Sequence, residues 1–245
     1  MNYEFDPIWE KVKHICSQKY NINCGKNSKF LGENIYSKFK DYNKFIYAEC
    51  GVYGGNTFMP IFHLCDILFD EFELYAIDSF SGFPDDVIGI NDKFERFVEL
   101  HNDRRITDEH FTAAIKRFNM LSNNEHLKSQ YFTDYSDRFH SYCENKKGIK
   151  IIQTTFDDLI TNLPLDKTFD IVFLDCDLYL SYIQCFEFFN NKCNIIILDE
   201  YYSLKYPGAR IATDKFINKN KKWKLFNKIE DNPYFERWGL IKIEQ

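Results

Sequence analysis

Residues that interrupt regular structure are scarce in this sequence, which has only 10 glycines and 6 prolines among 245 residues. Collagen-like and low-complexity chains are rich in these residues, so both classes are excluded. Disorder is excluded too, because disordered chains lack aromatic side chains and this chain has 25 Phe and 16 Tyr. We therefore expect one folded domain covering residues 1–245.

Long apolar runs and paired cysteine motifs are missing as well. The sequence has no run of 18 apolar residues, and its first residues show neither a basic region nor an apolar stretch. We therefore expect no membrane span and no secretory signal. No two of the eight cysteines are three residues apart, which excludes a CxxC zinc or redox motif. Cys50, Cys176 and Cys193 fall in apolar runs, and buried, reduced cysteines are typical of a cytoplasmic protein.

Positive charge is in deficit, since 31 Lys and Arg residues oppose 37 Asp and Glu residues and leave a net charge of −6. Binding to nucleic acid needs clustered basic residues, so we expect no nucleic-acid partner. The densest basic stretch, residues 219–224, is interpreted as a solvated helix end that runs into a strand.

Helix-like and strand-like segments alternate along most of the chain. Residues 1–44 show helical periodicity and are expected to form an amino-terminal helical extension. Further helices are expected at 56–69, 107–118 and 208–219, and between the fourth and fifth strands up to residue 189. The expected strands are 45–50, 72–77, 149–152, 169–174, 193–198, 223–228 and 235–243.

This order of segments predicts an α/β protein with a Rossmann-like, mostly parallel sheet that is covered by helices on both faces. The last two strands have no helix between them, so we expect an antiparallel hairpin at one edge of the sheet. Residues 79–148 are less regular and are expected to form a variable insertion. Ligands of such sheets bind beyond the carboxyl ends of the strands, which makes those ends the candidate site.

The first strand ends in a glycine-rich turn, and the second ends in an acid. The turn, residues 51–55, fails the dinucleotide pattern G-x-G-x-x-G because Tyr53 stands at the second glycine position. Glu49, just before the turn, would repel a pyrophosphate and accept hydrogen bonds from an ammonium group. Asp78, at the second strand end, suits the two hydroxyls of a ribose. S-adenosylmethionine meets both conditions; an ordinary turn and a helix-capping acid are the alternatives.

Carboxylates also follow the fourth and fifth strands, at Asp175 and Asp177 and at Asp199 and Glu200. Acids at neighbouring strand ends repel one another, so we expect a positive charge between them. Oxygen ligands suit Mg²⁺ best, and Mn²⁺ or Fe²⁺ next. The alternative is a set of acids exposed in polar loops.

Taken in order, these segments resemble the macrocin O-methyltransferase (TylF) family of class I S-adenosylmethionine-dependent enzymes. The resemblance covers residues 45–216. It rests on five segments: Ala48-Glu49-Cys50-Gly51-Val52-Tyr53-Gly54-Gly55, Ile77-Asp78-Ser79-Phe80-Ser81-Gly82-Phe83-Pro84, Leu174-Asp175-Cys176-Asp177-Leu178-Tyr179, Ile197-Leu198-Asp199-Glu200-Tyr201 and Gly208-Ala209-Arg210-Ile211-Ala212-Thr213-Asp214-Lys215-Phe216.

The resemblance implies methyl transfer to a sugar hydroxyl, assisted by a divalent metal, on a class I methyltransferase sheet. The implied cofactor-binding residues are Glu49, Gly51, Gly55, Asp78 and Ser79. The implied metal ligands are Asp175, Asp199 and Glu200. The chain departs from the family pattern at Asp199-Glu200, where Asp-Asp is common, and across residues 83–149, where the substrate contacts are expected. Related enzymes are often dimers or larger, so a homo-oligomer is a candidate state.

The base that accepts the hydroxyl proton has several candidates. Asp175 and Asp177 are the nearest in sequence, and the histidines that can serve instead are His101, His110, His126 and His140. Abundant Lys, Asn, Ile and Phe point to an AT-rich genome, which favours a nucleotide-linked or surface-polysaccharide sugar, such as a capsular one, as the acceptor. The competing hypotheses are a metal-dependent methyltransferase of catechol-like phenols, a nicotinamide oxidoreductase and a non-catalytic binding protein.

Overall fold

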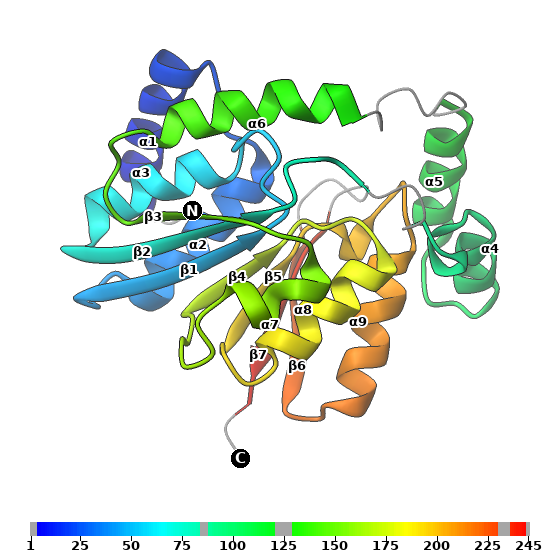
Figure 1. Ribbon diagram of the computed structural model, residues 1–245. Helices are drawn as coiled ribbons and strands as arrows, with labels where there is room; N and C mark the ends of the chain where they lie inside the picture. Colours follow the sequence, from blue (N-terminus) through cyan, green and yellow to red (C-terminus); the bar gives the residue numbers. More distant parts are fainter. Residues whose placement is uncertain (1–3, 84–87, 121–128, 230–235, 244–245) are drawn as a thin grey trace.

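A mixed sheet organises the molecule in the computed structural model, which describes residues 4–83, 88–120, 129–229 and 236–243 (Figure 1). Within these residues the sheet has seven strands in the order β3-β2-β1-β4-β5-β7-β6. Every neighbouring pair is parallel except β5 with β7 and β7 with β6. The strands are β1 (Lys44–Cys50), β2 (Glu71–Asp78), β3 (Ile149–Gln153), β4 (Ile171–Leu174), β5 (Ile195–Leu198), β6 (Trp223–Ile229) and β7 (Glu236–Lys242). The expected mostly parallel sheet with an antiparallel edge hairpin is confirmed.

Helices cover both faces of this sheet, as Figure 1 shows. One face packs against α1 (Phe5–Tyr20), α2 (Lys26–Phe39), α3 (Phe58–Leu68) and α6 (Ser129–Cys143). The other packs against α7 (Leu159–Asn162), α8 (Tyr179–Phe189) and α9 (Gly208–Lys219). Two further helices, α4 (Glu95–Asn102) and α5 (Asp108–Met120), share a small cluster of their own beside α9. The short 3₁₀ helices are η1 (Ile90–Asp92), η3 (Phe156–Asp158) and η4 (Glu200–Tyr202).

Strand β1 shows why the apolar runs fold this way. Side chains alternate between the two faces of a strand, so Phe45 and Tyr47 enter the core under α1–α3, whereas Ala48 and Cys50 enter the core over α8 and α9. All four are buried. Fully burying a Phe side chain contributes roughly 1.5–3 kcal/mol, so a strand that is apolar on both sides is stable only between two layers of helices.

Two strands begin later in the structure than the sequence predicts, because ladder hydrogen bonding is incomplete at their amino ends. The fourth and fifth strands were expected to begin at Phe169 and Cys193, but these residues form only an isolated bridge before β4 and β5 start. Helices α4 and α6 were not expected, because aromatic and polar residues are mixed along both segments. Among the described helices, none combines the length and the apolar character that crossing a membrane requires.

Candidate active site

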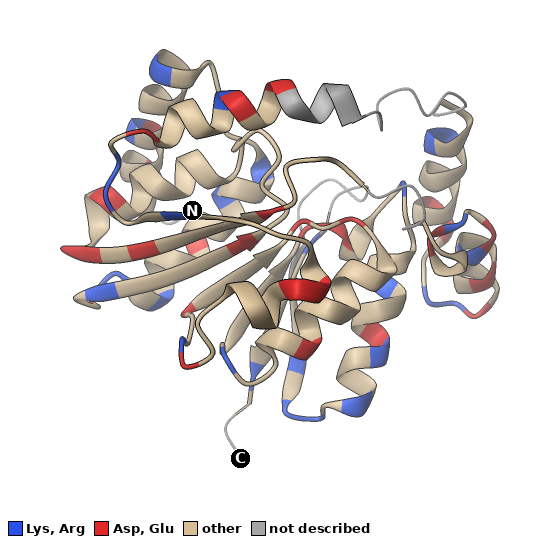
Figure 2. Cartoon of the chain, viewed as in Figure 1, with Lys and Arg blue, Asp and Glu red and all other residues tan. Residues whose placement is uncertain are grey.

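The carboxyl ends of the central strands bring the predicted acids together. Strand β4 lies between β1 and β5, with Leu174 level with Cys50 on one side and with Leu198 on the other. The residues that follow continue these ladders, since the amide of Asp175 bonds to the Cys50 carbonyl at 2.8 Å and the amide of Asp199 to the Leu174 carbonyl at 2.9 Å. Acidic residues accordingly mark the strand ends in Figure 2.

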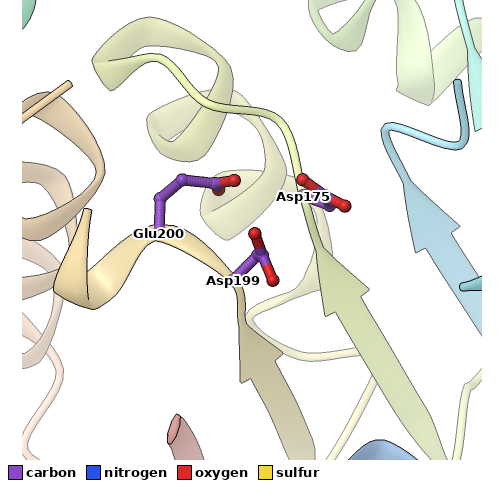
Figure 3. Close-up of side chains that lie close together, drawn as sticks. All are labelled: Asp175, Asp199 and Glu200. Carbon is purple, nitrogen blue, oxygen red and sulfur yellow. The ribbon is translucent and has the colours of Figure 1, made fainter. Parts of the chain in front are cut away.

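Asp175, Asp199 and Glu200 form one carboxylate cluster. One oxygen of each lies within 4.8 Å of the others, and Figure 3 shows the three side chains converging from the end of β4, the end of β5 and the start of η4. The hydroxyl of Tyr182, on α8, lies 2.8 Å from Oε2 of Glu200 and 2.9 Å from the Leu174 carbonyl. Tyr182 therefore ties Glu200 to the strand that carries Asp175. This acid trio has the number and kind of oxygen donors that a divalent cation takes.

The pKa values of all three carboxyl groups in the acid trio are raised. Burial is the largest cause that raises the pKa of Asp175, and the charges of Asp199 and Asp177 add to it. Burial likewise raises the pKa of Glu200, followed by the charges of Asp199 and Asp175. The pKa of Asp199 is raised by burial, although Arg237 opposes the shift. Three ionised carboxylates at such a site need a cation or a proton between them.

Asp177 lies beside the acid trio in a sterically restricted backbone conformation. Its φ is 57°, in the left-handed region that non-glycine residues seldom occupy. Burial raises its pKa to about 6, against the lowering effect of Lys205. Tyr53 and Phe80 have similar φ values, 50° and 53°, in the turns that follow β1 and β2. Such conformations cluster where surrounding structure holds a site in shape.

The glycine-rich turn is fixed to the rest of the site. Gly51 has φ 89°, and a Cβ there would lie 2.6 Å from the carbonyl carbon of Asp175, so the turn touches the backbone of the acid trio. Asp78 organises the turn from β2, because its Oδ2 accepts hydrogen bonds from the amides of Val52 at 2.7 Å and Tyr53 at 2.9 Å. Its Oδ1 accepts one from Phe80 at 2.8 Å, which leaves acceptor capacity on that oxygen.

The other predicted cofactor residues flank this turn. Glu49 is buried, with 1% of its surface exposed, and its Oε2 accepts a hydrogen bond from the Tyr47 hydroxyl at 2.6 Å. Burial raises the pKa of Glu49; the Tyr47 bond opposes this shift, and the charges of Asp199 and Asp78 reinforce it. Gly55, with φ 77°, closes the turn. The Ser79 hydroxyl donates to the Gly82 carbonyl at 3.1 Å and so shapes its own loop.

The insertion between β2 and β3 is anchored to the loops that follow β4 and β5. Asp92, buried in η1, accepts a hydrogen bond from the amide of Tyr179 at 2.7 Å, just after Asp177. His110 of α5 bonds to the Ser203 carbonyl at 2.7 Å and stacks on Tyr202 at 4.0 Å, just after Glu200. Helices α4 and α5 are thereby held beside the strand ends.

The histidines proposed as bases make other contacts. His101 pairs with Asp108 at 2.7 Å, and Nδ1 of His140 lies 2.8 Å from the Ser136 carbonyl. Together with His110, these are the candidate histidines that the structure describes. Their hydrogen bonds go to Asp108, Ser203 and Ser136 and not to the acid trio. His126 lies outside the described residues.

Several residues of this site were missed by the sequence analysis. Tyr47 is two residues before Glu49, so the two-residue period of a strand predicts that both lie on one face. Tyr182, Asp92 and Asn27 had no such signal, because they reach the site from distant segments. Asn27, in the first turn of α2, donates a hydrogen bond from its side-chain amide to Oδ1 of Asp199.

Comparison with known proteins relates this chain to methyltransferases by structure alone. No family model matches the sequence. No curated protein matches it either. The O-methyltransferase NovP superposes with a TM-score of 0.57 at 19% identity, over 90% of this chain and 79% of that one. The calicheamicin methyltransferase CalS11 gives 0.53 at 11% identity, over 98% and 92% of the two chains. A caffeoyl-CoA O-methyltransferase assigned in Staphylococcus aureus gives 0.50 at 12% identity, over 98% and 97%.

These likenesses support the sheet architecture predicted from the sequence, which is mostly parallel with an antiparallel pair at one edge. The shared region extends through the amino-terminal helices, because the match to CalS11 covers nearly the whole chain. Sequence identities below one fifth show a shared architecture only. The chemistry must be argued from the residues of the site. The chain has the Rossmann-like fold of class I O-methyltransferases.

Proposed function

We propose that this protein is an S-adenosylmethionine-dependent O-methyltransferase that acts on a sugar hydroxyl with the help of a divalent metal. The observation that carries the proposal is the meeting of Asp175, Asp199 and Glu200 at the carboxyl ends of β4 and β5 on this fold. Resemblance to the macrocin O-methyltransferase family supports the same chemistry, since its motif positions fall on these strand ends.

The acid trio fits a hard divalent cation. Mg²⁺ takes oxygen ligands and usually keeps several positions for water or substrate, so Asp175, Asp199 and Glu200 would hold it through their carboxylates. Glu200 supplies a carboxylate where an Asp is common, and its longer side chain is held by Tyr182. Mg²⁺ is the metal we propose, with Mn²⁺ and Fe²⁺ as the alternatives.

The turn after β1 and the end of β2 are the proposed cofactor site. The buried carboxylate of Glu49 accepts a hydrogen bond from the neutral hydroxyl of Tyr47. Because burial raises the pKa of Glu49, an ammonium group would stabilise its ionised form. Asp78 keeps an acceptor position on Oδ1 for a ribose hydroxyl while holding the turn. Gly51, Gly55 and Ser79 shape the loops against which the remainder of the cofactor would lie.

Asp177 is the proposed base. With a pKa of about 6, the Asp177 carboxylate is ionised at neutral pH. A pKa slightly below neutral pH is favourable for a general base that works near neutral pH. A bound metal would lower the pKa of the acceptor hydroxyl. The methyl group would pass from the sulfonium of S-adenosylmethionine to the hydroxyl oxygen, with cleavage of the carbon–sulfur bond and release of S-adenosylhomocysteine. Asp177 accepts the hydroxyl proton, and Asp175 orients the reacting oxygen as a member of the acid trio.

A binding experiment tests the cofactor and the metal separately. We expect the full-length protein to bind S-adenosylhomocysteine and not nicotinamide dinucleotides, and to bind Mn²⁺, used as a spectroscopic probe for Mg²⁺, with one ion per chain. Asp199→Ala should abolish Mn²⁺ binding and turnover. The matched control is Asp166→Ala, an exposed acid far from the site. Full methyl transfer in the presence of a strong chelator would overturn the metal role.

An acceptor screen tests the substrate class. Methyl incorporation is measured with nucleotide sugars, polysaccharide fragments and catechols, with and without Mg²⁺. We expect incorporation into nucleotide-linked or surface-polysaccharide sugars. Selective methylation of catechols would instead support the phenolic alternative, and preference for a nicotinamide cofactor would support the oxidoreductase.

A further inference from the structure

Asn27 connects the amino-terminal helices to the acid trio. It lies in the first turn of α2, and its side-chain amide donates to Oδ1 of Asp199, which is 172 residues away in the sequence. Asp199 thus has a donor from the amino-terminal helices, as Glu200 has one from Tyr182 of α8. An amide that donates to a carboxylate favours the ionised form, which is the form that binds a cation.

The position of Asn27 is fixed by close packing of α2. Gly32, one and a half turns further along the helix, has no side chain, and a Cβ there would lie 2.9 Å from Trp9, 3.1 Å from Phe5 and 3.2 Å from Leu64. This absence lets α2 approach α1 and α3 closely. Lys29 adds an ion pair to Asp6 of α1 at 2.9 Å. The first turn of α2 is therefore held rigidly over the end of β5.

The side-chain oxygen of Asn27 provides a second, independent observation. Its Oδ1 is buried and has no hydrogen-bond partner among the described residues. An unsatisfied buried acceptor costs roughly 1–3 kcal/mol, so such groups mark sites where a ligand or its water supplies the missing donor. The donor side of the same amide already touches Asp199, which places this acceptor at the edge of the acid trio.

We infer that Asn27 is a positioning residue of the metal site: its amide holds the Asp199 carboxylate, and its Oδ1 accepts a hydrogen bond from water bound to the cation. This inference rests on the proposed function, because it assigns Asn27 to the cation site proposed there. It makes the amino-terminal helical segment part of the active site, whereas the sequence assigns to it only the role of an extension. Partners of this kind, one shell away from the metal, typically change metal affinity by 10–100-fold.

The test measures Mn²⁺ affinity of the full-length protein by titration, independently of turnover. Asn27→Ala is expected to weaken Mn²⁺ binding by about 10–100-fold. Asn23→Ala, an exposed asparagine just before α2, is the matched control and should bind like the unaltered protein. Asn27→Leu keeps the approximate size of the side chain but removes both the donor and the acceptor, so it should also weaken binding and serves if Asn27→Ala folds poorly.

The outcomes separate this inference from the proposed function. If Asp199→Ala abolishes Mn²⁺ binding while both Asn27 variants bind normally, the inference is wrong and the metal site stands. Affinity for S-adenosylhomocysteine should stay within about twofold in both variants; a parallel loss would show general damage to the site and count against it. If the unaltered protein binds no Mn²⁺, both the inference and the metal site fail.

Discussion

Replacing Gly51 with alanine tests how the cofactor turn and the acid trio are joined. At φ 89° an alanine must adopt the left-handed conformation, which costs roughly 1–2 kcal/mol. The new Cβ would lie 2.6 Å from the carbonyl carbon of Asp175, whereas unstrained carbon atoms pack at about 3.5–4.0 Å. The obstacle is backbone at the end of β4 and cannot rotate away, so overpacking adds about 1–3 kcal/mol.

These contributions predict that Gly51→Ala lowers the free energy of unfolding by about 2–5 kcal/mol. For a chain of this length each kcal/mol shifts the Tm by about 2–4 °C, so a fall of roughly 4–20 °C is expected in a thermal melt. Relief of the overlap requires Asp175 to move, so Mn²⁺ affinity should fall as well, although Gly51 is not a ligand.

Gly25→Ala is the matched control. Gly25 precedes α2 with φ −77°, and a Cβ there meets nothing within 4 Å. The loss of a favourable helix cap and the gain from a stiffer unfolded chain are both below about 1 kcal/mol and oppose each other. A Tm of Gly51→Ala within about 2 °C of this control would refute the reasoning that the turn is packed against β4.

Three further predictions concern titration and the anchoring of the insertion. Burial lowers the pKa of His110 from 6.5 to about 4, so the unfolded chain binds more protons between these values; His110 should withdraw about 2 kcal/mol of stability on acidification from about pH 8 to pH 5, and His110→Gln should show a smaller fall in Tm over that range. Asp92→Asn should destabilise the protein by about 1–2 kcal/mol, because the amide of Tyr179 loses a charged acceptor. The same change should raise the KM for the acceptor more than the KM for the cofactor, and equal effects on both KM values would contradict this. Because the pKa values of Asp175 and Glu200 are raised, Mn²⁺ should displace protons and bind more tightly as the pH rises; calorimetry in buffers of different ionisation enthalpy measures that release, and its absence near pH 6 would count against the raised values.

The fold could be predicted because its signals are local. A strand buried on both faces must be apolar throughout, and a short run such as Ile195–Leu198 matches that requirement. The positions of Asp175 and Asp199 followed from the same logic, since parallel strands side by side end at the same edge of the sheet. Prediction of the acids therefore needed only the strands and the residue after each one.

The remaining parts of the site depend on contacts that leave no local pattern. Asp92 is buried within a polar segment, and its two backbone partners lie at Gly89 and, far along the chain, at Tyr179. Asn27 stands among polar residues at the start of a helix, where a capping or solvent-exposed role would be the ordinary expectation. Both act through long-range packing of helices and loops on the sheet, which composition and periodicity do not encode.

The electrostatics of the strand ends give these distant contacts their purpose. Burial raises the pKa of Glu49, Asp175, Asp199 and Glu200, so these carboxyl groups hold protons unless a cation compensates their charge. Asn27, Tyr47 and Tyr182 each place a donor on one of these carboxylates, which orients the group without cancelling its charge. Arg237 lowers the pKa of Asp199, but burial outweighs this effect, so a bound cation would still stabilise the ionised carboxylates. The same arrangement accommodates both charges that the proposed reaction requires, an ammonium beside Glu49 and a divalent cation within the acid trio.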